Sequence, residues 1–168
     1  MTSVYHYHSP LGGITISGSG NELTGLWFDG QKYFGSTLPK EYEEQPLPVF
    51  EETRKWLDIY FSGKAPDFTP LLKMETTPFR KAVWELLLTI PFGQTLTYGG
   101  IADRIAKQMG LPHMSAQAVG GAVGHNPISL IIPCHRVVGT DGSLTGYAGG
   151  IEKKLHLLTM ENAEIVQR

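Results

Sequence analysis

The chain has 168 residues, one cysteine, a formal net charge of −2 and 41% hydrophobic side chains. This length and apolar content suit one or two small globular domains, and a single cysteine excludes a disulfide-stabilised scaffold. No apolar run approaches the roughly 20 residues that cross a bilayer, and the N-terminal sequence lacks the basic and apolar blocks of a signal peptide. We therefore expect a cytoplasmic protein that has no membrane partner and is monomeric in solution.

Three short apolar runs predict an antiparallel sheet at the start of the chain. The runs cover residues 4–8, 14–16 and 23–28, and turn sequences rich in glycine and serine separate them. A helix is expected next, because apolar side chains recur at helical spacing over residues 49–60 and Gly63 can end the helix.

A stretch without regular period divides the chain. Residues 64–70 contain two prolines and no periodic pattern, so we place a domain boundary between this stretch and Thr77. The predicted domains are residues 1–75, a small antiparallel sheet domain with one helix, and residues 76–168, a mainly helical domain. The predicted fold class is therefore α+β. Basic side chains outnumber acidic ones only in the second domain, which weakly favours an anionic partner there.

Small hydroxyl side chains mark the starts of the short helices predicted in the second domain. Three residues can cap these helices: Thr77, Thr97 and Ser115. The first helix shows an apolar stripe over residues 79–90. The last helix is expected from about Ile151, with Leu155 and Leu158 facing the core.

The segment over residues 115–124 combines a helical pattern with several glycines. Val119 and Val123 lie one turn apart and can face the core. The opposite face carries almost no side chains: Gln117, Gly120, Gly121 and Gly124. Each glycine inside a helix costs roughly 1 kcal/mol relative to alanine, so something must come close to the backbone on this bare face.

Two partners for the bare face remain open. One is a second helix packed tightly against the glycines. The other is DNA, because the preceding helix and the break over residues 109–112 form a helix-turn-helix, whose second helix commonly enters a DNA groove. A nucleotide-binding loop is excluded, since the glycines lack the G-x-G-x-x-G spacing and the chain has no G-x-x-x-x-G-K-[ST] motif. We expect no cofactor.

The only thiol belongs to Cys134, which follows an apolar run over residues 128–132 that we predict as a strand. Its neighbours His135 and Arg136 can lower its pKa, because an imidazole can take the proton and a guanidinium charge favours the thiolate. Neighbours in sequence need not be neighbours in space, so inert burial and a reactive nucleophile both remain open. The glycine-rich loop around Tyr147 is either a plain surface loop or the wall of a site for a planar group.

Four motifs together resemble a known family of DNA-repair proteins. In chain order they are Ala118-Val119-Gly120-Gly121-Ala122, Asn126-Pro127, Pro133-Cys134-His135-Arg136-Val137-Val138 and Tyr147-Ala148-Gly149-Gly150. Over the second domain they closely resemble the O6-alkylguanine-DNA alkyltransferases, also called methylated-DNA-protein-cysteine methyltransferases. The first domain is similar only in length and layout to that family's ribonuclease-H-like sheet domain.

The resemblance implies a suicidal repair reaction on double-stranded DNA that carries O6-alkylguanine. In this family a damaged guanine is flipped out of the duplex, and a cysteine thiolate takes the alkyl group from O6 in one displacement. The matching catalytic residues are Cys134, His135, Glu161 and Asn126. Cys134 would be the acceptor, and His135, held by Glu161, would deprotonate it through a water. Asn126 would brace the turn between the recognition helix and the active-site strand. Activity on O4-methylthymine stays open.

The resemblance also assigns residues that bind the substrate and the DNA. The guanine pocket would comprise Tyr98, Val137, Tyr147, Ala148 and Gly149. The DNA-binding set would comprise Thr97, Ser115, Ala116, Gln117, Gly120, Gly121 and Arg136. Of these, Arg136 is implied to be either a structural cation or a cation on the DNA side.

This chain departs from the family pattern in three places. Several relatives carry an arginine that fills the space left by the flipped base, whereas this chain has Gln117, which is shorter and uncharged. The segment between Tyr98 and Gln117 is longer than in some relatives, with residues 107–114 as the extra loop. Some relatives bind structural zinc in the first domain, but the cysteines for it are absent, and the chain has no other metal-binding motif. We expect no metal.

Three other functions stay in competition with alkyl transfer. A non-catalytic sensor of alkylated DNA would not need Cys134. A helix-turn-helix regulator would need base-reading side chains, and the helix over residues 115–124 offers only Gln117. A Cys-His hydrolase would explain the thiol but not the bare helix face.

Overall fold

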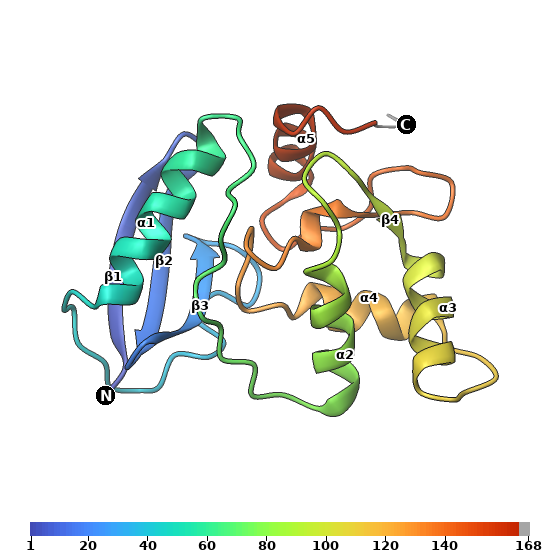
Figure 1. The fold of residues 1–168 in the computed structure, drawn as a ribbon, viewed down its shortest axis with the longest axis horizontal. Helices are drawn as coiled ribbons and strands as arrows, with labels where there is room; N and C mark the ends of the chain where they lie inside the picture. Colours follow the sequence, from blue (N-terminus) through green and yellow to red (C-terminus); the bar gives the residue numbers. More distant parts are fainter. Residues whose placement is uncertain (165–168) are drawn as a thin grey trace. The chain divides into compact units, whose positions relative to one another are not determined.

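The structure, a computed structural model, describes residues 1–164, which form two compact units (Figure 1). The first unit contains residues 1–74 and the segment Pro127–Ile131. The second unit contains Glu75–Asn126 and the described residues from Ile132 onward. The structure thus differs from a single division after residue 75, because a short piece of the later sequence belongs to the first unit.

The first unit is built on a three-stranded antiparallel sheet. Its strands are β1 (Ser3–Ser9), β2 (Gly12–Ser19) and β3 (Glu22–Phe28), in the order β1-β2-β3. Gly12 begins β2 and Gly20 lies in the turn between β2 and β3, with φ of 110° and 63°, where a side chain would be strained. The predicted meander is confirmed.

One helix, α1 (Pro48–Phe61), covers this sheet (Figure 1). Its buried side chains include Trp56, Leu57 and Tyr60, at the spacing that the sequence predicted. Gly63 follows with φ of 90°, and its N–H donates to the carbonyl of Tyr60 (3.0 Å), so the expected end of the helix is confirmed.

The apolar run over residues 128–132 is not the expected strand. In the described chain it makes one isolated bridge to β3, where the backbone of Leu26 bonds that of Pro127 and Ser129 (2.8 and 2.9 Å). The chain then turns at Leu130, which has a φ of 71°. The side chains of the run are apolar because they are buried in the core, although the segment does not form a strand paired with a neighbour.

The second unit consists of short helices and one small parallel pair of strands. Its elements are α2 (Pro78–Leu87), β4 (Leu96–Thr97), α3 (Tyr98–Gln108), α4 (Ala116–Gly124), the 3-10 helix η1 (Cys134–Arg136), β5 (Val137–Val138) and α5 (Ile151–Met160). β4 and β5 pair in parallel. The sequence did not predict these strands, because two residues are too few to show a period.

The three expected helix caps are confirmed. The hydroxyls of Thr77, Thr97 and Ser115 each accept a hydrogen bond from the backbone N–H three residues further on, at 3.2, 2.9 and 3.0 Å. These caps begin α2, α3 and α4, so the helix-turn-helix formed by α3 and α4 has its two helices started by local sequence.

The face of α4 opposite the bare face packs against the core of the second unit. Val119 and Val123 are buried, as expected, and contact between α2 and α4 is fixed by a hydrogen bond from Trp84 Nε1 to the carbonyl of Ala122 (2.8 Å). This bond satisfies the indole N–H in the core and holds the helix by its backbone.

The last helix, α5, buries Leu158 as predicted but not Leu155. Leu157 and Leu158 are fully buried, whereas Leu155 is only half-buried and Lys154 is buried in its place. Within residues 1–164, no helix has both the length and the apolar character needed to cross a membrane.

Candidate active site

Cys134 begins η1, directly after Pro133. Its side chain is buried, with 5% of the residue exposed, and its N–H donates to the carbonyl of Ile132 (2.8 Å). The 3-10 turn consists of three consecutive residues: Cys134, His135 and Arg136. The thiol, the imidazole and the guanidinium are therefore brought into the same small region of the second unit.

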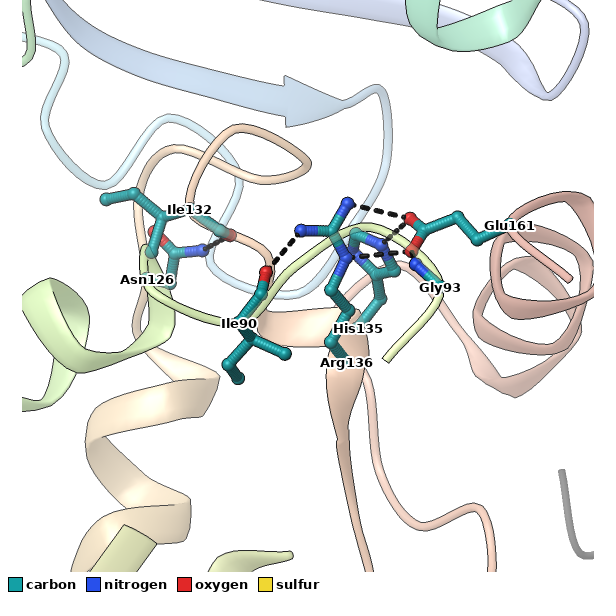
Figure 2. Close-up of polar contacts among 7 residues, drawn as sticks. All are labelled: Ile90, Gly93, Asn126, Ile132, His135, Arg136 and Glu161. Atoms are coloured by element: carbon teal, nitrogen blue, oxygen red, sulfur yellow. Dashed lines mark hydrogen bonds and ion pairs between the residues drawn. The ribbon is translucent and has the colours of Figure 1, made fainter. Parts of the chain in front are cut away.

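Glu161 joins the imidazole and the guanidinium of this turn (Figure 2). Its Oε2 lies 2.6 Å from His135 Nε2 and accepts from the terminal Nη2 of Arg136 at 3.1 Å, while its Oε1 accepts from Arg136 Nε at 2.8 Å. The same Oε1 accepts the backbone N–H of Gly93 (3.0 Å), and Arg136 Nη1 donates to the carbonyl of Ile90 (2.8 Å). One carboxylate thus fixes both side chains and the loop after α2.

Burial and charge set the protonation states of this network. Burial alone would raise the pKa of Glu161, but the hydrogen bonds and charges of His135 and Arg136 outweigh it and hold that pKa well below its usual range. Burial lowers the pKa of His135, although Glu161 opposes the shift. A neutral His135 that donates from Nε2 to Glu161 has Nδ1 as its acceptor nitrogen.

The thiol itself is not activated in the way that the sequence suggested. Burial raises the pKa of Cys134, and the influences that lower it are a hydrogen bond from Asn126, the charge of Lys154 and nearby backbone N–H groups. Arg136 does not act on the thiol as expected, because its guanidinium is paired with Glu161. The side chains that lower the pKa of the thiol are therefore Asn126 and Lys154, and not the expected Arg136.

Asn126 lies at the end of the helix-turn-helix and bonds across the turn that follows. Its Nδ2 donates to the carbonyl of Ile132 (2.8 Å), as Figure 2 shows. Its side chain also bonds the thiol of Cys134. The side chain is 4% exposed, so these bonds are shielded from water. One amide links the residues on both sides of the Pro127–Ile131 segment to the nucleophile.

Two tyrosines lie in this region, Tyr98 beside the thiol and Tyr147 beside His135. Tyr98 starts α3, and its pKa is raised by burial and by the charge of Cys134, against a hydrogen bond with Thr145. The ring of Tyr147 meets that of His135 edge-on, with 6.5 Å between centroids and an interplanar angle of 76°. The sequence brings both tyrosines to this region as expected, but it gave no sign of Thr145.

The remaining pocket residues follow the same loop. Val137 is fully buried, while Ala148 and Gly149 are half-buried beside Tyr147. The N–H of Gly150 donates to the carbonyl of Tyr147 (2.9 Å), which closes the loop into a turn.

The bare face of α4 is open, as the sequence anticipated. Ser115, Ala116, Gln117 and Gly121 are exposed, and Gly120 and Gly124 are half-buried. Beyond the helix backbone, a Cβ built on Gly121 or Gly124 would have no described atom within 4 Å, and one on Gly120 would only touch the ring of Tyr98 at 4.0 Å. A second helix packed on these glycines is therefore ruled out within residues 1–164.

Besides Ser115, whose hydroxyl caps α4, two residues expected at the DNA make hydrogen bonds within the protein. The hydroxyl of Thr97 caps α3, and Arg136 is 8% exposed with its guanidinium held by Glu161 and Ile90. Of the two roles that the sequence left open for Arg136, the geometry supports the structural one, because a paired and buried guanidinium cannot reach a phosphate.

Sequence reasoning missed Lys154. Its Nζ donates to the carbonyls of Thr145 and Gly146 (3.2 Å each), and it lies 5.9 Å from the centroid of the Tyr98 ring. A signal was present, since Lys154 stands three and four residues before Leu157 and Leu158 and so occupies their buried stripe.

Known proteins match this chain over both units. Residues 4–74 match the family described as 6-O-methylguanine DNA methyltransferase, ribonuclease-like domain, and residues 78–163 match its DNA binding domain. A methylated-DNA--protein-cysteine methyltransferase of Haemophilus influenzae is 40% identical over 171 residues, covering 100% of this chain and 92% of that protein. The protein of the same name from Mycobacterium tuberculosis is 44% identical over 162 residues, covering 94% of this chain and 93% of the relative.

Solved structures agree with these matches. The crystal structure of Mycobacterium tuberculosis O6-methylguanine methyltransferase superposes with a TM-score of 0.81 at 42% identity, covering 96% of this chain and 93% of that one. The crystal structure of Mycobacterium tuberculosis OGT in complex with DNA gives a TM-score of 0.82 at 41% identity, with 95% and 92% covered. The resemblance found in the sequence is confirmed: the chain belongs to the 6-O-methylguanine DNA methyltransferase family.

Proposed function

We propose that this protein repairs DNA by moving the alkyl group from O6 of a guanine in double-stranded DNA to the sulfur of Cys134. The observation that carries the proposal is the position of the chain's single cysteine, beside a buried His135–Glu161 pair and bonded by Asn126, which lies two residues after the open helix α4. Curated relatives named methylated-DNA--protein-cysteine methyltransferase, and a related structure in complex with DNA, support the same reaction.

The chemical step is a single displacement. The thiolate sulfur of Cys134 forms a bond to the alkyl carbon, the bond from that carbon to O6 breaks, and its electron pair stays with the guanine. The thiol proton passes through a water to His135, whose neutral ring is held by Glu161 for this purpose. Asn126, which bonds the thiol, orients the sulfur.

The departing guanine gains negative charge and needs a hydrogen-bond donor. Tyr98 is suited to this task, because a phenol is protonated at neutral pH and burial, which raises its pKa, keeps it so. Tyr147, Ala148 and Gly149, with the carbonyl of Val137, form the wall against which the flipped base would rest.

The open face of α4 is suited to a DNA groove. Side chains are nearly absent from it, so the sugar–phosphate backbone can approach the helix closely, and the hydroxyl of Ser115 caps its start. Ala116, Gln117, Gly120 and Gly121 would line this contact. Gln117 stands where several relatives carry an arginine, so it would fill the space left by the flipped base with a shorter, neutral side chain.

The reaction inactivates the protein. The product is an S-alkylcysteine, a thioether without an easy leaving group, so each molecule acts once. We further propose that the protein works as a monomer in the cytoplasm and needs neither cofactor nor metal for this transfer.

The test is a single-turnover assay on a short duplex with one O6-methylguanine, followed by peptide mass spectrometry. We expect one methyl group on Cys134, stoichiometric and without turnover, and none from an undamaged duplex. Cys134→Ser and Cys134→Ala should abolish transfer but retain binding. Transfer by either variant would overturn the assignment.

The same assay separates the competing functions. Selective binding of the damaged duplex without an adduct would mark a lesion sensor, and no selective binding would favour a regulator or a hydrolase.

A further inference from the structure

Lys154 is fully buried, with 0% exposed, on the inner side of α5. Lysine is almost never fully buried unless its charge is balanced, because removing an ammonium from water is costly. Among the described residues no carboxylate lies within ion-pair distance of its Nζ, which instead donates to the backbone carbonyls of Thr145 and Gly146 (3.2 Å each). Carbonyls solvate an ammonium but carry no full negative charge to balance it.

The charge of Lys154 acts on the thiol of Cys134 and favours its deprotonated form. The lysine lowers the pKa of the thiol, and the thiolate in turn raises the pKa of the lysine. Burial opposes both charged forms, raising the pKa of Cys134 and lowering that of Lys154 to about 8. The two groups therefore support each other's charged state in a site that penalises each alone.

The carbonyls that Lys154 holds begin the loop of the guanine pocket. Thr145 also bonds the phenol of Tyr98 through its side chain, and Lys154 Nζ lies 5.9 Å from the centroid of the same ring. Two residues after Thr145, the ring of Tyr147 meets His135. Lys154 thus contacts the loop at Thr145, which bonds Tyr98, and at Gly146, which directly precedes Tyr147.

We propose that Lys154 is a positioning residue for alkyl transfer, whose buried ammonium stabilises the Cys134 thiolate and anchors the loop that carries Thr145 and Tyr147. This inference rests on the proposed transfer to Cys134 and adds a source of positive charge that the catalytic residues do not supply. Burial lowers the pKa of His135 and so favours its neutral form, and the guanidinium of Arg136 forms an ion pair with Glu161.

The groups that face Lys154 come from several elements. They are the thiol of Cys134 and the imidazole of His135 on η1, the phenol of Tyr98 on α3 and the two loop carbonyls. Of these, the thiol of Cys134 is the group that becomes an anion in the proposed transfer, so the lysine acts mainly on the nucleophile.

The single cysteine makes the proposal directly measurable. The absorbance of the thiolate at about 240 nm reports Cys134 alone once the signal of Cys134→Ser is subtracted, and it can be followed against pH in the wild type, Lys154→Met and Lys153→Met. Methionine keeps the length of the lysine stem without its charge. Lys153→Met removes the same charge from the neighbouring position and serves as the control.

We expect Lys154→Met to move the thiolate titration upward by about one pH unit and to slow single-turnover methyl transfer at pH 7 by about tenfold. Amide hydrogen exchange over residues 145–150 should also become faster, because the loop loses its anchor. Lys153→Met should match the wild type in all three measurements. A folded Lys154→Met with an unchanged titration and an unchanged rate would overturn the proposal.

A second measurement needs no substitution at Lys154. The side-chain NMR titration of Lys154 should give a pKa near 8 in the wild type and a lower pKa in Cys134→Ser, where no thiolate can form. Equal values in the two proteins would also overturn the proposal. Failure of the wild type to take up a methyl group would instead count against the proposed function, whatever the titrations show.

Discussion

His135 and Glu161 lie 26 residues apart in the chain, yet His135 Nε2 is 2.6 Å from Glu161 Oε2 and both side chains are fully buried. The carboxylate also bonds Arg136 and the N–H of Gly93, so it satisfies four donors from two segments, η1 and the loop after α2. Glu161 therefore stabilises the second unit and orients the imidazole at the same time. The following two predictions separate these roles.

Glu161→Gln should destabilise the protein and slow alkyl transfer. The amide keeps the size of the side chain but leaves Arg136 as a buried charge without its counterion, which costs about 3 kcal/mol of unfolding free energy. Transfer should fall by about a hundredfold, as expected when a general base loses its orienting group. Urea unfolding and single-turnover rates measure the two effects.

The control for this prediction is the double variant Arg136→Met with Glu161→Gln. It removes both charges, so it should recover part of the lost stability while transfer stays slow, because His135 still lacks its carboxylate. If the double variant were no more stable than the single one, the buried charge of Arg136 would not be the cause of the loss.

Stability should fall with decreasing pH in two stages. Burial lowers the pKa of His135, so its contribution is present above about pH 6.5, the usual value for histidine, and is lost as pH falls below it. The pKa of Glu161 is also lowered, so its contribution is present above about pH 4.3 and is lost as pH falls further, toward the folded-state pKa. Urea unfolding at pH 7, 5 and 3 would reveal both stages, and Glu161→Gln should lack the second. A wild type equally stable at pH 7 and 3 would contradict this.

Local signals in the sequence were enough to predict much of the fold. Thr77, Thr97 and Ser115 act within one helical turn, so the starts of three helices could be predicted from adjacent residues. The open face of α4 also followed from spacing alone, because helical geometry places its glycines together.

Contacts between distant segments were less predictable. The run before Cys134 has the apolarity of a buried strand, but it lies in a turn, since burial and strand pairing leave the same apolar signal. Lys154 was missed because a lysine is expected at the surface, and only the partners that surround it in space explain its burial. Glu161 could be matched through the family resemblance, but its bond to Arg136 could not.

Gly121→Ala should stabilise the protein and weaken its binding to DNA. Alanine is the better helix former by about 1 kcal/mol, and the added Cβ meets no described atom within 4 Å. The free energy of unfolding should therefore rise. The same methyl group occupies the space that DNA would enter, and we expect binding of a duplex to weaken by about tenfold, or about 1.4 kcal/mol. Thermal unfolding and fluorescence anisotropy measure the two changes.

The matched control for Gly121→Ala is Glu52→Ala, an exposed position on α1. It also places alanine on a helix surface, but we expect it to leave DNA binding unchanged. Unchanged binding by Gly121→Ala itself would mean that DNA does not contact this face of α4.

Gln117→Arg should tighten binding to a duplex with O6-methylguanine. Gln117 is exposed near the start of α4, on the same side as the open glycines, so a longer cationic side chain would reach further into the DNA and add an attraction to phosphate. One added phosphate contact should steepen the dependence of log affinity on log salt by about 0.9. Affinity measured from 50 to 200 mM salt tests this, with Gln117→Ala as the control that shortens the side chain without adding charge. If arginine and alanine left affinity and salt dependence equal to those of the wild type, Gln117 would not be the residue that enters the duplex.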